Sequence, residues 1–243
     1  MTDEEKFIQS LYDEANEKLK EVYKEQKDNK DKLLQEIALI LLTYTILDNL
    51  MSLTSKDKTK EYKRLSALII SSTKCQGAIQ EKVITNILKD TVEKTFNFYF
   101  YNANLKDVKN IIENNFKGKH FSSNIWKNEE DVAKHLHKKV KDFLEGKINV
   151  NQIKNDIVKA YNTSAYNSKR LVETEVNRCE DEAFKRFCRE TGVKKVKRNE
   201  VLDNRICEEC KAIDGKIYDL DEAPGGIHPL CRGFNEVYEV LGN

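Results

Sequence analysis

Apolar residues recur every three to four positions through most of the first 191 residues, a pattern typical of helices. The first stripe predicts a helix from a Thr2 cap to about Lys27, after which "KDNKDK" marks a break or a solvated turn. Further helices are predicted at about 32–53, 55–77 and 78–102, with Gly77 as a stop signal. The positions that form the first stripe are Phe7, Ile8, Leu11, Tyr12, Ala15, Leu19 and Val22.

The pattern continues with shorter helices and then with its longest stripe. Asn104 caps a short helix to about Phe116, and helices follow at about 128–145 and 150–160. A helix at about 164–191 ends before Gly192, which suits the left-handed position after a helix. Its apolar stripe is Val172, Val176, Cys179, Ala183 and Phe187.

Five aromatic residues lie within the six positions 96–101. They would surround the end of their helix on both faces. Two interpretations stay open at this point: burial between helices, or an exposed docking surface for a partner.

The last fifty residues follow a different pattern. Residues 1–191 contain three glycines and no proline, whereas residues 192–243 contain six glycines and both prolines. Alternating segments at 193–201, 215–220 and 233–241 predict a small antiparallel sheet. We therefore expect a mainly α protein, with an elongated helical body and a small C-terminal α+β subdomain. The expected regions are 1–118 (helical), 119–192 (helical) and 193–243 (the tail).

Charge separates the regions only mildly. The chain is 34% charged with a formal net charge of +1, so overall charge predicts no polyanionic partner. Residues 119–200 carry 19 Lys and Arg against 13 Asp and Glu, whereas residues 201–243 carry 4 against 9. The apolar segment 37–53 contains polar residues and is short of the roughly 20 residues of a membrane span. We expect it to be a buried helix and expect no membrane partner.

The tail contains a candidate metal site. Cys207 and Cys210 are separated by two residues, as are His228 and Cys231, with seventeen residues between the pairs. Two such pairs suit a tetrahedral zinc ion held by three thiolates and one imidazole. A tail of this size buries little apolar surface, so a structural zinc would stabilise it. Two alternatives stay open: reduced cysteines in a tail held by packing, or a redox-active pair.

The site does not match the catalytic zinc motifs. The H-x-E and P-C-x-x-C order of zinc deaminases and the H-E-x-x-H motif of zincins are absent. Four protein ligands would also leave no open position for water. We expect a structural centre and no enzymatic activity, with a zinc hydrolase as the less favoured interpretation.

The second half of the chain resembles the bacteriophage minor head proteins, the Mu protein F-like head morphogenesis family. Three groups of residues over about 117–240 carry this resemblance. The first contains Phe121, Ser122, Ile125 and Trp126, and the second contains Arg170, Leu171, Val172, Thr174 and Glu175. Glu173 departs from the pattern, since the family usually has arginine there. The third contains Leu202, Asp203, Arg205, Cys207, Cys210, Asp214, Gly215, Lys216, His228, Pro229, Cys231 and Arg232.

The resemblance implies a minor virion component that associates with the portal protein and takes part in head assembly. It also implies scaffold protein, major capsid protein and viral DNA as further candidate partners. The expected location is the head interior near the portal, and the host cytoplasm during assembly. A role in genome packaging or ejection would follow from this location.

An alternative function is a zinc-stabilised DNA-binding module. A basic patch on phosphates would use the end of the long helix and the strand that follows it. Lysines on a solvated strand edge are the structural alternative, because they discourage aggregation. The candidate contacts are Lys185, Arg186, Arg189, Lys194, Lys195, Lys197 and Arg198.

Overall fold

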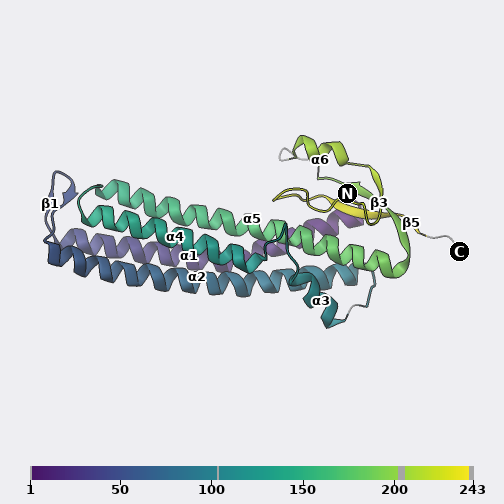
Figure 1. Cartoon of the computed structure of the whole chain (residues 1–243), viewed down its shortest axis with the longest axis horizontal. Coiled ribbons are helices and arrows are strands. Elements are labelled where there is room, and N and C mark those ends of the chain that lie inside the picture. The colour runs from purple at the N-terminus through teal and green to yellow at the C-terminus, as the bar shows by residue number, and fades with distance from the viewer. Residues whose placement is uncertain (1, 103, 202–205, 241–243) are drawn as a thin grey trace. The chain divides into compact units, whose positions relative to one another are not determined.

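The computed structural model describes residues 2–102, 104–201 and 206–240. As predicted, the described chain is mainly helical with a small C-terminal antiparallel sheet (Figure 1). The helices are α1 (Asp3–Thr43), α2 (Ser55–Phe98), α3 (Leu105–Ile112), α4 (Phe121–Leu144), α5 (Val150–Thr191) and α6 (Glu208–Ile213). The strands are β1 (Ile46–Leu47), β2 (Leu50–Met51), β3 (Val193–Asn199), β4 (Ile217–Asp219) and β5 (Phe234–Val240).

Helices α1, α2 and α5 each join two segments that the sequence pattern predicts as separate helices, and α4 begins at Phe121 rather than at about residue 128. The predicted break near residue 28 is wrong, because α1 continues and Asn29 is buried with its amide donating to Gln76 Oε1 at 3.4 Å. Gly77 does not end a helix either. A Cβ atom there would lie 2.5 Å from the Trp126 ring, so glycine allows α2 and α4 to approach closely. Likewise, α5 continues through residues 161–163.

The predicted helix at 32–53 ends early, at Thr43. The chain then reverses through a short hairpin in which Ile46 pairs with Met51. Asp48 and Asn49 at its turn have φ values of 51° and 64°. Asp and Asn tolerate this left-handed backbone, which a two-residue hairpin turn requires. None of the described helices combines the length and the apolar character needed to cross a membrane.

The chain forms two compact units, each built from segments distant in sequence. Unit 1 comprises Met1–Leu19, Val83–Phe121 and Lys169–Asn243, and unit 2 comprises Lys20–Lys82 and Ser122–Ser168. Helices α1, α2 and α5 each contribute to both. The sequential regions 1–118, 119–192 and 193–243 stay a prediction about domain organisation.

Unit 2 is a bundle of four helix segments, from α1, α2, α4 and α5 (Figure 1). Its apolar core contains residues from all four, including Ile37, Ile69, Leu136 and Ile157. Each helix has one apolar face because its apolar residues recur with a 3.6-residue period. Packing of these faces against one another stabilises the bundle without a metal ion.

A buried polar cluster interrupts this apolar interior. Glu129 is 4% exposed, and its Oε1 accepts from Gln80 Nε2 at 2.7 Å and from Ser164 Oγ at 3.2 Å. Gln26 Nε2 donates to Ser164 Oγ at 2.9 Å, and Ser168 Oγ donates to Gln80 Oε1 at 2.9 Å. Burial raises the pKa of Glu129 from 4.5 to about 7, and the hydrogen bonds from Gln80 and Ser164 to its carboxylate oppose the rise only in part.

In unit 1 the sheet has the strand order β4-β3-β5, all antiparallel. One apolar cluster packs it against α5, formed by Phe184, Cys188, Val193, Val196, Leu220 and Ala223. The aromatic segment at 96–101 is partly packed between helices and partly exposed. Phe98 stacks on Phe7 and Tyr99 stacks on Phe187, whereas Phe100 is 98% exposed.

We expect Glu129→Gln to stabilise unit 2 at alkaline pH. Because the folded pKa is raised, wild-type stability falls as pH rises from 4.5 to about 7 and then stays low. The variant should match wild type near pH 4.5 and exceed it by up to about 3 kcal/mol at pH 8. Urea unfolding followed by Trp126 fluorescence measures the free energy of unfolding of both proteins at each pH. Parallel pH profiles for the two proteins would show that Glu129 is not the titrating group.

Candidate metal centre

The structure brings the two distant ligand pairs of the tail together. His228 Nε2 lies 3.0 Å from Cys207 Sγ and 3.2 Å from Cys210 Sγ. The ligand atoms of these three residues all lie within 4.8 Å of one another. Cys231 Sγ lies 3.8 Å from Cys210 Sγ but is not a member of this tightest group. Cys207, Cys210 and His228 could therefore hold a metal ion, and their sulfur and nitrogen donors suit a thiophilic one.

Cys207 and Cys210 are placed by α6, a short helix that the sequence pattern did not predict. Cys207 is its N-cap residue, and its Sγ accepts from the Cys210 backbone N–H at 3.4 Å. This hydrogen bond lowers the pKa of the Cys207 thiol, and the His228 ring does so to a smaller extent. Burial instead raises the pKa of the Cys210 thiol.

His228 and Cys231 lie on a tight turn that orients both ligands. The His228 backbone N–H donates to Cys231 Sγ at 3.4 Å, and the Cys231 N–H donates to His228 O at 3.3 Å. His228 Nδ1 lies 2.9 Å from the Pro229 carbonyl, which holds the ring with Nε2 toward the two cysteines. A backbone carbonyl on the other ring nitrogen is the usual way in which proteins orient a metal-binding imidazole.

A polar face of α5 contacts the tail segment that carries this turn. The face comprises Thr174, Asn177, Asp181 and Lys185. Leu230 N–H donates to Thr174 Oγ1 at 3.2 Å, and Asn177 Nδ2 donates to Gly233 O at 2.8 Å. Lys185 Nζ donates to Ala223 O at 2.9 Å, and Asn235 Nδ2 donates to Asp181 Oδ1 at 2.8 Å. Sequence reasoning missed this face because it followed the apolar stripe of the same helix.

A cavity of about 290 Å³ borders the metal centre. The four candidate ligands line it together with the charged residues Glu173, Glu200 and Arg232. Glu173, which stands where the resemblance has arginine, has a side chain only 9% exposed and pairs with Lys169 Nζ at 3.7 Å. Of the residues behind the resemblance, Leu202, Asp203 and Arg205 lie outside the described part of the chain.

Seven residues were predicted as DNA contacts. The prediction is wrong for Arg198, because its side chain is buried with 0% exposure. Its Nε donates to Glu200 Oε1 at 2.7 Å and its Nη1 donates to Pro224 O at 3.2 Å, so it holds the tail internally. Across the sheet, Lys195 pairs with Glu239 at 3.7 Å and Lys197 pairs with Glu236 at 3.0 Å. Lys194 is exposed.

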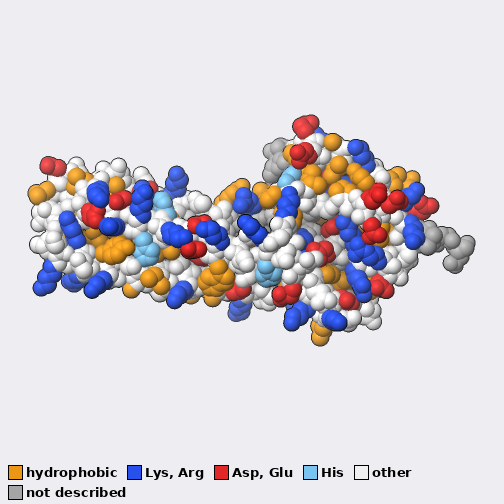
Figure 2. All heavy atoms as spheres, viewed as in Figure 1, with side chains coloured by type: hydrophobic (Ala, Val, Ile, Leu, Met, Phe, Trp, Pro, Cys, Tyr) orange, Lys and Arg blue, Asp and Glu red, His pale blue; other side chains and the backbone are white. Residues whose placement is uncertain are grey.

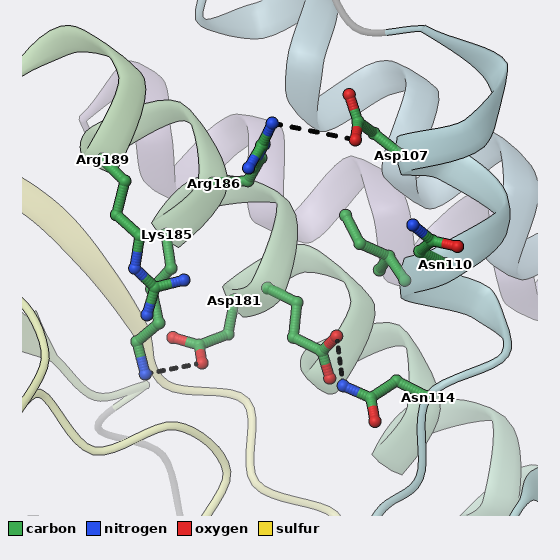
Figure 3. Close-up of a pocket in the computed structure, with 9 residues that line it drawn as sticks. Asp107, Asn110, Asn114, Asp181, Lys185, Arg186 and Arg189 are labelled. Atoms are coloured by element: carbon green, nitrogen blue, oxygen red, sulfur yellow. Dashed lines mark hydrogen bonds and ion pairs between the residues drawn. The ribbon is translucent and has the colours of Figure 1, made fainter.

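The three candidate DNA contacts on α5, which are Lys185, Arg186 and Arg189, line a groove of about 420 Å³ beside α3. Figure 3 shows Asp181 and Lys185 paired at 3.0 Å, and Arg186 directed at Asp107 at 3.8 Å. Arg189 lines the same groove and pairs with Asp221 at 3.0 Å. Acidic residues thus accompany the basic ones, and on the face shown in Figure 2 the two charge types are interspersed. DNA contact by these residues stays a prediction that this charge balance does not favour.

Comparisons of the chain with models of protein families, with curated proteins and with solved structures find no match.

We expect Arg198→Met to destabilise the tail by about 3–5 kcal/mol, because it leaves Glu200, with a side chain only 3% exposed, as an unpaired buried carboxylate. Lys194→Met is the matched control on the same strand and should change stability by less than about 0.5 kcal/mol. Hydrogen exchange of the β3–β5 amides measures both opening free energies. Equal opening free energies in Arg198→Met and Lys194→Met would mean that Arg198 does not stabilise the sheet.

Proposed function

We propose that this chain is a structural minor head protein of a bacteriophage, with a C-terminal tail fastened by one zinc ion. The ligands are Cys207, Cys210, His228 and Cys231. The observation that carries the proposal is the convergence of Cys207 and Cys210 with His228, although seventeen residues separate the two pairs in sequence. These residues belong to the most specific of the three groups behind the resemblance to the Mu protein F-like family.

Zinc is the metal that best suits this set of donors. Three thiolates and one imidazole on two tight turns form a closed tetrahedral site, with expected distances of about 2.3 Å to sulfur and about 2.0–2.1 Å to nitrogen. Cys231 Sγ, 3.8 Å from Cys210 Sγ, is close enough to supply the fourth donor. A closed site leaves no position for a metal-bound water, so we propose no catalytic role.

The biological role follows from the resemblance. The protein associates with the portal protein and takes part in head assembly, with scaffold protein, major capsid protein and viral DNA as further partners. It belongs in the head interior near the portal, and in the host cytoplasm during assembly. The interspersed charge on the face shown in Figure 2 supports polar contacts with other proteins rather than a strong affinity for DNA.

Purified particles of the phage that encodes the chain provide the test. Mass spectrometry should detect its peptides in mature heads at a small fraction of the major capsid protein. Cys210→Ala should reduce this incorporation several-fold, because the tail loses a metal ligand. Cys188→Ala replaces another buried cysteine, one in the apolar cluster beneath the sheet, and should leave incorporation near wild type. Particles that lack the wild-type chain would contradict a virion role.

A further inference from the structure

Three side chains of unit 1 form hydrogen bonds with the backbone around Cys231. Thr174 accepts from the N–H of Leu230, the residue before Cys231, at 3.2 Å. Tyr12 Oη donates to the carbonyl of Cys231 itself at 3.4 Å. Asn177 donates to the carbonyl of Gly233, two residues after it, at 2.8 Å. None of these three side chains is a candidate metal ligand, yet each contacts the backbone within two residues of Cys231.

We propose that Thr174 and Asn177 of α5 are positioning residues for the metal centre, which hold His228 and Cys231 ready to meet Cys207 and Cys210. This inference rests on the proposed metal centre. It adds that the turn is prearranged by the helix rather than ordered by the ion. Binding of the metal then requires less ordering of the chain than in a small domain that folds only around its zinc.

The Thr174 hydroxyl must accept a hydrogen bond from Leu230 N–H, and its other hydrogen bond leaves it free to do so. Its Oγ1 donates to the Arg170 carbonyl at 2.7 Å, one turn earlier in α5. The hydroxyl proton is therefore committed to the helix, and a lone pair remains for the Leu230 N–H. The helix thus sets the direction of the bond.

Leu230 shows that the turn needs such support. Its φ of 69° lies in the left-handed region, which a branched side chain rarely adopts without compensation. Glycine would be the favoured residue at this position if the turn determined its own conformation. The bond from Leu230 N–H to Thr174 provides the external constraint in the middle of the His228–Cys231 turn.

Asn177 supports the other end of the segment. Its side chain is 3% exposed, and its amide group reaches Gly233. A Cβ atom on Gly226 would lie 2.6 Å from Asn177 Oδ1, so the chain leading into His228 passes directly against the same side chain. One residue of α5 therefore contacts the backbone both before His228 and after Cys231.

The experiment measures zinc affinity of the full-length protein by competition with a chromophoric chelator. Thr174→Val removes the hydroxyl at nearly constant shape, and Thr174→Ser keeps it. Asn177→Ala removes the bond to Gly233. Thr191→Val and Asn162→Ala are matched controls, because both residues are exposed on α5 and Thr191 makes the same type of bond to its own helix.

Thr174→Val and Asn177→Ala should each weaken zinc binding by about 10- to 100-fold, as is typical for residues that orient metal ligands. Thr174→Ser and the two controls should stay within about threefold of wild type. The cobalt-substituted protein supplies a readout that general destabilisation would not change. The thiolate-to-cobalt charge-transfer absorption per bound ion should fall in the two weakened variants, because Cys231 is displaced.

The outcomes separate the two proposals. A wild-type chain that binds no zinc or cobalt would overturn the metal centre, and this inference with it. A wild type that binds zinc, with Thr174→Val and Asn177→Ala indistinguishable from their controls in affinity and cobalt absorption, would overturn the positioning role alone. Measurements made well below the thermal midpoint of each variant keep unfolding out of the comparison.

Discussion

The tail of this protein depends on hydrogen bonds from helix α5 to an irregular backbone. Residues 220–233, between β4 and β5, form no helix or strand, yet they carry two of the four candidate metal ligands. Buried backbone groups in such a segment need partners, since an unpaired one costs about as much as a lost hydrogen bond. Thr174, Asn177 and Lys185 supply three of these partners at intervals that keep them on one face of the helix. We propose that these contacts set the positions of His228 and Cys231.

Packing and metal binding therefore act on different parts of the tail. The sheet is fastened to α5 by an apolar cluster that includes Phe184, Val196 and Leu220. The metal would join α6 to the His228–Cys231 turn, whose ligand atoms already lie 3.0–3.8 Å from Cys207 Sγ or Cys210 Sγ. A structural zinc contributes about 10–16 kcal/mol to small domains that are unfolded without it. Here α5 and the sheet already order part of the site, so we expect the ion to contribute less to folding. A tail held by these contacts would suit the phage-head component that we propose.

Periodicity predicted the class of the fold, and spacing predicted that Cys207, Cys210 and His228 lie together. The change from a period of 3.6 to a period of 2 near Gly192 located the sheet, and Asn104 was correctly identified as an N-cap. The pattern failed where tertiary contacts override local signals. Gly77 lies inside a helix because Trp126 packs on it, and Asn29 lies inside another because it is buried beside Gln76. Arg198 resembles its basic neighbours in sequence, and only its burial shows that it is structural. The polar face of α5 is likewise visible only once the tail is seen to lie against it.

The distant pairs Cys207–Cys210 and His228–Cys231 are proposed to share one closed metal centre. X-ray absorption at the zinc edge of the zinc-loaded protein would determine which atoms surround the ion. We expect three sulfur neighbours at about 2.3 Å and one nitrogen at about 2.0–2.1 Å, with no oxygen. Two sulfurs and a nitrogen with an added oxygen neighbour would contradict the proposal, because Cys231 would then be no ligand and the centre would be open to water.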